Sequence, residues 1–202
     1  MLARPLQEAL MALKAEFQGE SVLMATLPAD AVFARATGGE LDECIPRLLE
    51  LVAVGDLADR YAFEVFDLLA TAGWQEWDMP AVQAISHWAD AWWRTILVDF
   101  PGEQRAADRL GELAHLNLTA IRWLGPWLEY LDGPAAQHLA DFVINGSLHP
   151  AWVGFEDQYQ QAVAWTQSET LINGITMVAG AYFEPGQMAE VLERVVVTPG
   201  LA

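Results

Sequence analysis

Apolar side chains recur every three to four residues along most of the chain, and this spacing constrains the fold more than any other feature. The pattern begins with Leu6, Leu10, Leu13 and Phe17. Such a period places the apolar residues on one face of an α-helix. Proline and glycine interrupt the pattern at short intervals, which predicts short helices joined by tight turns. Only the run at 195–198 has the composition of a strand. The sequence therefore predicts an all-α protein.

The interruptions predict where the helices begin and end. We expect helices at 3–18, at 21–36 in two pieces around Pro28, and at 46–54, 60–72, 79–100, 103–115, 119–131, 134–144, 156–166, 168–183 and 186–197. Taken in pairs, they form units beginning near 46, 79, 119 and 156, a spacing typical of helical-hairpin repeats. No residue-level repeat accompanies the spacing. Two arrangements therefore stay open, stacked helical hairpins of the α-solenoid-like or HEAT-like kind and a globular helical bundle. Either forms a single domain over residues 1–202.

The charge of the chain limits its partners. Hydrophobic residues make up 53% of the sequence and charged residues 19%, which is typical of a folded chain with a sizeable core. Asp and Glu number 28 against 10 Lys and Arg, a formal charge of −18. Binding to nucleic-acid phosphates or to anionic lipid needs clustered cations. We therefore expect no nucleic-acid partner and no membrane, and a negative field that favours a basic protein.

The termini and cysteine content indicate a cytoplasmic protein. Cys44 is the single cysteine, so no disulfide can form within the chain. Polar residues such as Gln7 and Glu8 interrupt the N-terminal apolar run, unlike in a secretion signal. The charge-free apolar stretches at 143–155 and 170–183 are too short to span a bilayer. One Lys against nine Arg, with abundant Ala, indicates a GC-rich, bacterial source.

No catalytic motif is present in the sequence. Cys44 follows Glu43, and an adjacent carboxylate disfavours the reactive thiolate, so we expect a buried structural cysteine. No serine lies in a Gly-x-Ser-x-Gly motif. Glycine-rich phosphate-binding loops are also missing. The sequence therefore predicts no catalytic residue and no cofactor.

Two segments share the pattern His-x-Ala-Asp. They end in the pairs His87 with Asp90 and His138 with Asp141. Residues at i and i+3 share a helix face and can ligate one metal. However, the helical wheel places His87 and Asp141 away from the apolar face, whereas ligands of a buried metal project inward. We therefore expect solvated polar faces and no metal.

Tryptophan is unusually frequent between residues 74 and 127. The seven in this stretch are Trp74, Trp77, Trp88, Trp92, Trp93, Trp123 and Trp127. At helical spacing they are most simply core residues, and an aromatic binding groove is the alternative. Trp88 lies to one side of its helix's apolar face, so we expect it to be partly exposed and able to anchor a partner.

One part of the chain resembles a known family. Its residues are Ile45-Pro46-Arg47-Leu48-Leu49-Glu50-Leu51, then Ala72-Gly73-Trp74 followed by Trp77, then the Trp-rich segment ending at Trp92-Trp93. This order resembles a family of uncharacterised bacterial all-helical proteins with the pattern Phe-Leu-Pro-Arg-Leu-Leu-Glu-Leu, Ala-Gly-Trp-x-x-Trp-Pro and a Trp-rich helix. The chain departs from it where Asp78-Met79 precedes Pro80. The resemblance implies a helical fold and no particular activity.

These observations together predict a non-catalytic helical protein that binds another protein. The acidic cluster of Glu40, Asp42 and Glu43 would recruit a basic partner, and Trp88 would contact it. The alternative is an enzyme or small-ligand binder with a Trp-lined pocket. Its polar candidates would be His87, Asp90, His138 and Asp141.

Overall fold

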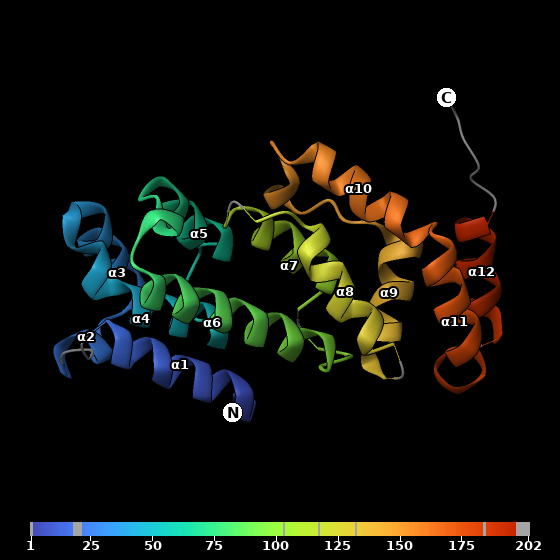
Figure 1. Cartoon of the computed structure of the whole chain (residues 1–202), viewed down its shortest axis with the longest axis horizontal. Helices are drawn as coiled ribbons and strands as arrows, with labels where there is room; N and C mark the ends of the chain where they lie inside the picture. Colours follow the sequence, from blue (N-terminus) through green and yellow to red (C-terminus); the bar gives the residue numbers. More distant parts are fainter. Residues whose placement is uncertain are drawn as a thin grey trace. The chain divides into compact units, whose positions relative to one another are not determined.

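The computed structural model describes residues 2–17, 22–102, 104–116, 118–131, 133–183 and 185–196. Within these ranges the regular structure is helical and no strand occurs (Figure 1), which confirms the all-α prediction. The run at 195–198, which has the composition of a strand, is helical in its described half, Val195 and Val196, in agreement with the helix expected at 186–197. Residues 197 and 198 lie outside the described ranges. Backbone contacts group the chain into two compact units, Met1–Trp92 and Trp93–Ala202.

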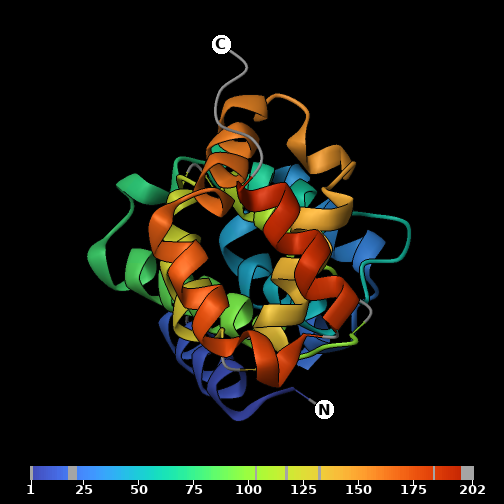
Figure 2. The same ribbon diagram turned by 90° about the vertical axis from the view of Figure 1, so that its right-hand side faces the viewer.

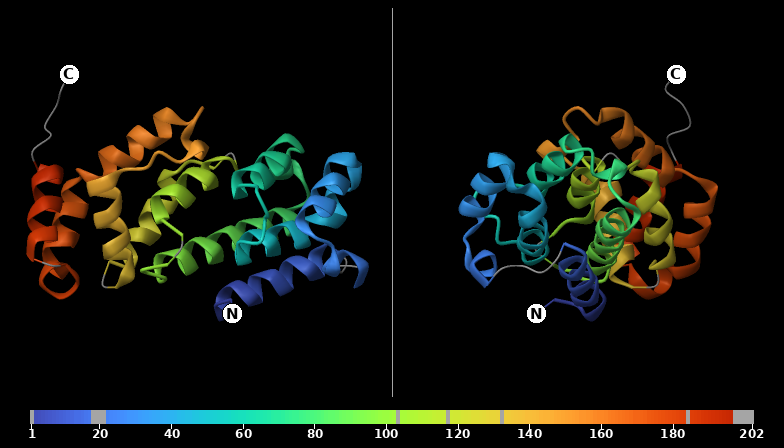
Figure 3. Two further views of the ribbon diagram at one scale, coloured as in Figure 1. Left: turned by 180° about the vertical axis from the view of Figure 1, so that it is seen from behind. Right: turned by 60° about the vertical axis from the view of Figure 1, so that its left-hand side comes forward.

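Helix α4 is the centre of the first unit, since α1, α2, α3 and α5 all pack on it (Figure 3). The elements are α1 (Arg4–Glu16), α2 (Val22–Thr26), α3 (Ala29–Arg35), η1 (Ala36–Glu40), α4 (Leu41–Val54), α5 (Ala62–Thr71), η2 (Trp74–Glu76) and the first part of α6 (Met79–Leu97). Gly39 has a φ of 104° and interrupts the helical path between α3 and α4, a conformation that glycine adopts without strain.

Helix α4 begins earlier than its sequence predicts. Pro46 was expected in the first turn, but the helix starts at Leu41 and Pro46 lies buried inside it. Proline lacks the N–H that would bond to the carbonyl four residues back, so it weakens a helix interior. Asp42 and Glu43 occupy the first turn instead, where negative charge favours the helix dipole.

The second unit is built around α9, against which α7, α11 and α12 pack. Helices α11 and α12 also contact each other, as Figure 2 shows. The elements are the end of α6, α7 (Ala106–Ala114), α8 (Ile121–Glu129), α9 (Pro134–Asn145), η3 (Pro150–Trp152), α10 (Glu156–Thr166), α11 (Glu169–Tyr182) and α12 (Pro185–Val196). Between α9 and α10 the chain is largely irregular.

Tryptophans occupy the core of both units. In the first unit Trp88 stacks on Trp92 with ring centroids 5.5 Å apart, and Phe66 of α5 meets both rings edge-on. In the second unit the Trp93 indole N–H donates to the carbonyl of Trp123 at 2.9 Å. Trp88 is 0% exposed, so the expectation that it reaches solvent is wrong. Phe66 of α5 covers the side of α6 on which Trp88 lies. A helical wheel describes one helix alone, so it cannot predict this contact.

Candidate functional site

The two His-x-Ala-Asp motifs differ in their surroundings. On α6, His87 is exposed and Asp90 half-buried. On α9, His138 is buried, and its Nε2 donates to the carbonyls of Ile96 and Asp99, each at 3.0 Å. The expectation of a solvated face is therefore wrong for His138, which closes the carboxyl end of α6. Burial lowers the pKa of His138, because desolvation disfavours the imidazolium.

Asp141 also has a structural role. Its carboxylate accepts a hydrogen bond from Arg105 Nε at 2.9 Å and another from Asn145 Nδ2 at 2.8 Å. Within the described ranges, no three His, Cys, Asp or Glu side chains converge as metal ligands. The structure thus uses His138 and Asp141 to join elements of the second unit.

The acidic cluster at the start of α4 is exposed, as its proposed role requires. Arg35 forms ion pairs with Glu40 and, at 3.8 Å, with Glu43. Cys44 lies fully buried beside them, and burial raises the pKa of its thiol. The cluster is therefore partly neutralised by its own chain, and the cysteine is a core residue.

A more elaborate arrangement surrounds residues 146–155, which we call the anchored loop. It runs from the end of α9 to the start of α10 (Figure 1), and α7 packs against its η3 turn. Arg105, which precedes α7, donates from Nη2 to the Gly146 carbonyl at 2.9 Å. Ser147 Oγ donates to Asp108 Oδ1 at 2.6 Å. These bonds fix the loop where it leaves α9.

The far end of the loop is fixed by Trp152. Its indole N–H donates to the Ala107 carbonyl at 3.2 Å, and its ring lies on the backbone of Gly111. A Cβ at Gly111 would come within 2.8 Å of the Trp152 ring. Only a residue without a side chain allows this approach, so glycine in the middle of α7 has a packing reason.

Buried polar groups lie between α7 and the loop. Glu112 is 0% exposed and accepts a hydrogen bond from Arg109 through Oε2. Its Oε1 forms no hydrogen bond with the described residues and lies 3.9 Å from His149 Nε2. His149 Nδ1 accepts from the N–H of Ala151 at 3.3 Å, so the neutral ring carries its proton on Nε2, facing Glu112. His115 Nε2 donates to the Ala151 carbonyl at 2.8 Å.

Titration of His149 is governed by this burial. Desolvation lowers the pKa of His149, although Glu112 and Asp108 act in the opposite direction. The ring is thus held neutral, as its bond from the Ala151 N–H requires. Ser147 Oγ donates to the Asp108 carboxylate, and the His149 ring accepts the Ala151 N–H, so both side chains hold the loop in place.

The other side of the anchored loop faces solvent. Leu148 is 99% exposed and Val153 is 74% exposed. Glu156 and Asp157, both exposed, follow the loop in the first turn of α10. Glu156 Oε1 accepts the Gly154 N–H at 3.0 Å, and this bond lowers the pKa of its carboxyl. The loop and the first turn of α10 therefore carry two exposed apolar side chains and two exposed acidic ones.

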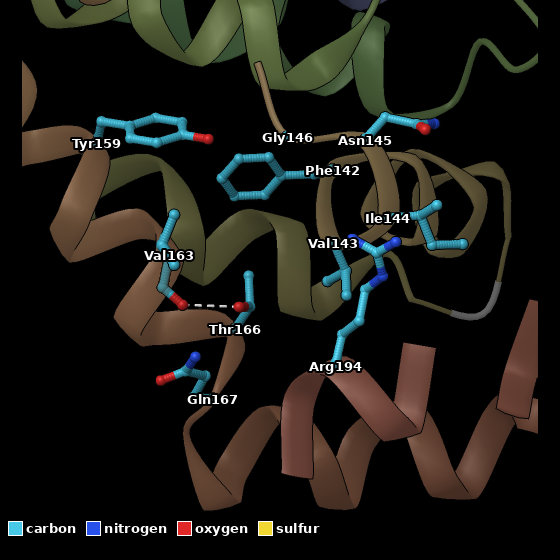
Figure 4. Close-up of a pocket in the computed structure, with 10 residues that line it drawn as sticks. All are labelled: Phe142, Val143, Ile144, Asn145, Gly146, Tyr159, Val163, Thr166, Gln167 and Arg194. Atoms are coloured by element: carbon cyan, nitrogen blue, oxygen red, sulfur yellow. Dashed lines mark hydrogen bonds between the residues drawn. The ribbon is translucent and has the colours of Figure 1, made fainter. Parts of the chain in front are cut away.

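A hollow of about 420 Å³ lies beside the loop in the second unit (Figure 4). Phe142, Tyr159 and Val163 give it an apolar side, and Thr166 and Gln167 add polar groups. Arg194, a charged residue that also lines the hollow, is bonded to Glu190 at 3.1 Å. Its volume suits a small ligand. Among the described residues that line this hollow there is no tryptophan, unlike in the Trp-lined pocket that the alternative function predicts.

Comparisons with family models, curated proteins and solved structures find no match for this chain. No helix within the described ranges has both the length and the hydropathy needed to cross a bilayer. In the sequence, residues 146–155 contain Gly, His and Pro between two expected helices, which indicates only a loop. The burial of Ser147 beside the exposed Leu148 cannot be predicted from the sequence, because it depends on the contact of the loop with α7.

Proposed function

We propose that this protein is a cytoplasmic, non-catalytic helical protein that binds a basic protein partner. The resemblance to an uncharacterised bacterial helical family belongs to the same proposal. Its acidic surface recruits the partner, because a strongly negative field accelerates encounter with a positive one.

The observation that carries the proposal is how the chain uses its cations. Nine of its ten Lys and Arg side chains lie in ion pairs with its own carboxylates. Arg122 lies over the Trp123 ring, 5.1 Å from its centroid. The 28 carboxylates outnumber these cations, so the surplus charge is negative. Exposed carboxylates in both units include Asp56, Asp59, Glu76, Asp99, Asp157, Glu169 and Glu193.

The test begins with proteins that copurify with this chain from its source cell at low salt. The partner is then purified, and its association rate is measured by stopped-flow or biolayer interferometry over increasing NaCl. We expect association to slow steeply, because the Debye length shrinks from ~10 Å at 0.1 M to ~3 Å at 1 M. Equal association rates at low and high salt would show that the charge does not recruit the partner.

The acidic cluster provides variants for the same experiment. Neutralising Asp42 and Glu43 as Asp42→Asn with Glu43→Gln should slow association and flatten its salt dependence. These residues also favour the start of α4, so a thermal melt must first show an intact fold. The matched control is Glu169→Gln with Glu193→Gln, which removes the same charge from exposed positions of the second unit.

A further inference from the structure

The anchored loop has an inner side and an outer side made of different residues. Ser147, Ala151 and Trp152 are buried, whereas Leu148 is almost wholly and Val153 largely exposed. Single exposed apolar residues are ordinary on protein surfaces. These two are unusual because both belong to one segment that is held firmly from beneath.

Each exposed side chain is flanked by fixed backbone. Before Leu148, Ser147 is bonded to Asp108; after it, the His149 N–H donates to Ser147 Oγ at 3.2 Å. Before Val153, Trp152 is bonded to the Ala107 carbonyl. After it, the Gly154 N–H is held by Glu156.

This fixation matters for binding. A loop that is ordered before it meets a partner loses less conformational entropy on binding, so more of the contact energy remains as affinity. Beneath the loop, Ser147 is bonded to Asp108 and Trp152 to the Ala107 carbonyl, and satisfied buried hydrogen bonds of this kind favour one arrangement. The loop therefore presents its two apolar side chains in one defined geometry.

Charge indicates what kind of partner fits here. Glu156 and Asp157 lie directly after the loop and are exposed. The nearest cations on α7 and before it, Arg105 and Arg109, are engaged by Asp108, Asp141 and Glu112. The exposed apolar residues thus border negative charge, which complements a segment with lysine or arginine around apolar side chains.

We propose that the outer side of the anchored loop, formed by Leu148, Val153, Glu156 and Asp157, is the surface on which a protein partner docks a basic segment with apolar side chains. This inference rests on the proposed function and deepens it by naming the contact surface.

The test uses three synthetic peptides of defined chemistry. The first has leucine and lysine at helical spacing, the second replaces each leucine with serine, and the third replaces each lysine with glutamate. We expect the leucine–lysine peptide to bind in isothermal titration calorimetry at low salt. We expect the other two to bind at least about tenfold more weakly, since each lacks one half of the complementary chemistry.

Variants then locate the site. Leu148→Ser with Val153→Ser should weaken the leucine–lysine peptide about tenfold or more, because central apolar contacts supply much of an interface's affinity. The matched control is Met177→Ser on α11, a residue that is 87% exposed and belongs to another element, and it should change nothing. Glu156→Gln with Asp157→Asn should slow peptide association more than Glu169→Gln with Glu193→Gln does. Hydrogen exchange should slow at 146–157 when the peptide is bound.

The outcomes separate this inference from the proposed function. If the leucine–lysine peptide binds but the Leu148/Val153 variant and the Met177 variant bind it with equal affinity, the proposed docking surface is wrong. The proposal of a basic partner then still stands. If the glutamate peptide binds as well as the lysine peptide, the preference for a basic partner is wrong. If the leucine–lysine peptide does not bind at all, the docking surface is overturned, and the copurified partner alone decides the function.

Discussion

Trp88 and Trp93 are a natural comparison at the scale of single residues, because both are fully buried on α6 but only one uses its indole N–H. Trp93 Nε1 donates to the Trp123 carbonyl. Trp88 Nε1 is buried and forms no hydrogen bond with the described residues. A buried donor without an acceptor destabilises the folded state. Replacing Trp88 with phenylalanine removes this donor, and the gain offsets part of the packing energy lost with the larger ring.

We therefore predict that Trp88→Phe is better tolerated than Trp93→Phe. Both variants remove similar volume, but Trp93→Phe also removes a buried hydrogen bond, a difference of about 1 kcal/mol in the free energy of unfolding. Urea denaturation of the two variants measures it. Equal destabilisation, or greater destabilisation by Trp88→Phe, would contradict the prediction.

The buried His138 and the half-buried His149 predict how stability depends on pH. Burial lowers the pKa values of His138 and His149 below the ordinary 6.5. Just below pH 6.5 the unfolded chain therefore binds protons that the folded chain does not, and folding loses stability as the pH falls through this value. We predict a lower free energy of unfolding at pH ~5.5 than at pH ~7.5. Both pH values lie above the range in which most carboxylates titrate, so the histidines dominate the difference.

His138→Gln tests the source of this pH dependence. Glutamine keeps an N–H donor for the Ile96 and Asp99 carbonyls but does not titrate. The variant should therefore lose part of the pH dependence, and His138→Gln with His149→Gln should lose more of it. His87→Gln is the control, because His87 is exposed. An unchanged slope in the double variant would show that other groups cause the effect.

At the scale of elements, the contact between α7 and the anchored loop depends on Gly111. Replacing glycine with alanine inside a helix normally stabilises it by up to about 1 kcal/mol. At Gly111 the new Cβ would lie 2.8 Å from the Trp152 ring. We predict that Gly111→Ala destabilises the protein and speeds hydrogen exchange in 146–155, because Trp152 is displaced.

Gly186→Ala is the matched control for this helix effect. Gly186 lies in the first turn of α12, is exposed, and has open space where a Cβ would stand. This substitution should be neutral or slightly stabilising in a thermal melt. A stabilising effect of Gly111→Ala would show that Trp152 does not depend on this close approach.

Helices could be predicted from the sequence, but the candidate site could not. Proline, glycine and apolar spacing are local signals, and they located most helices, including α3, α5, α6 and α10, to within a few residues. The anchoring contacts are not local. Ser147 is bonded to Asp108 across 39 residues, and Trp152 to Ala107 across 45. Burial of Trp88 failed as a prediction for the same reason, since the covering residue Phe66 lies on another helix.

At the scale of the whole molecule, the formal charge of −18 opposes folding, because it brings like charges closer together than they are in the unfolded chain. Salt should reduce this repulsion. The Debye length falls from ~30 Å at 0.01 M to ~8 Å at 0.15 M, so distant carboxylates stop repelling each other while close ion pairs keep most of their attraction.

We therefore predict that the thermal midpoint rises by several degrees as NaCl increases over this range, where ~1 kcal/mol corresponds to roughly 2–4 °C for a chain of this size. A variant with Asp56→Asn, Asp59→Asn, Glu169→Gln and Glu193→Gln should melt higher at low salt and respond less to NaCl. Sucrose added instead of salt is the control for effects unrelated to charge. A midpoint that falls with NaCl would mean that the ion pairs of Arg35, Arg60 and Arg105 outweigh the repulsion between the surplus carboxylates.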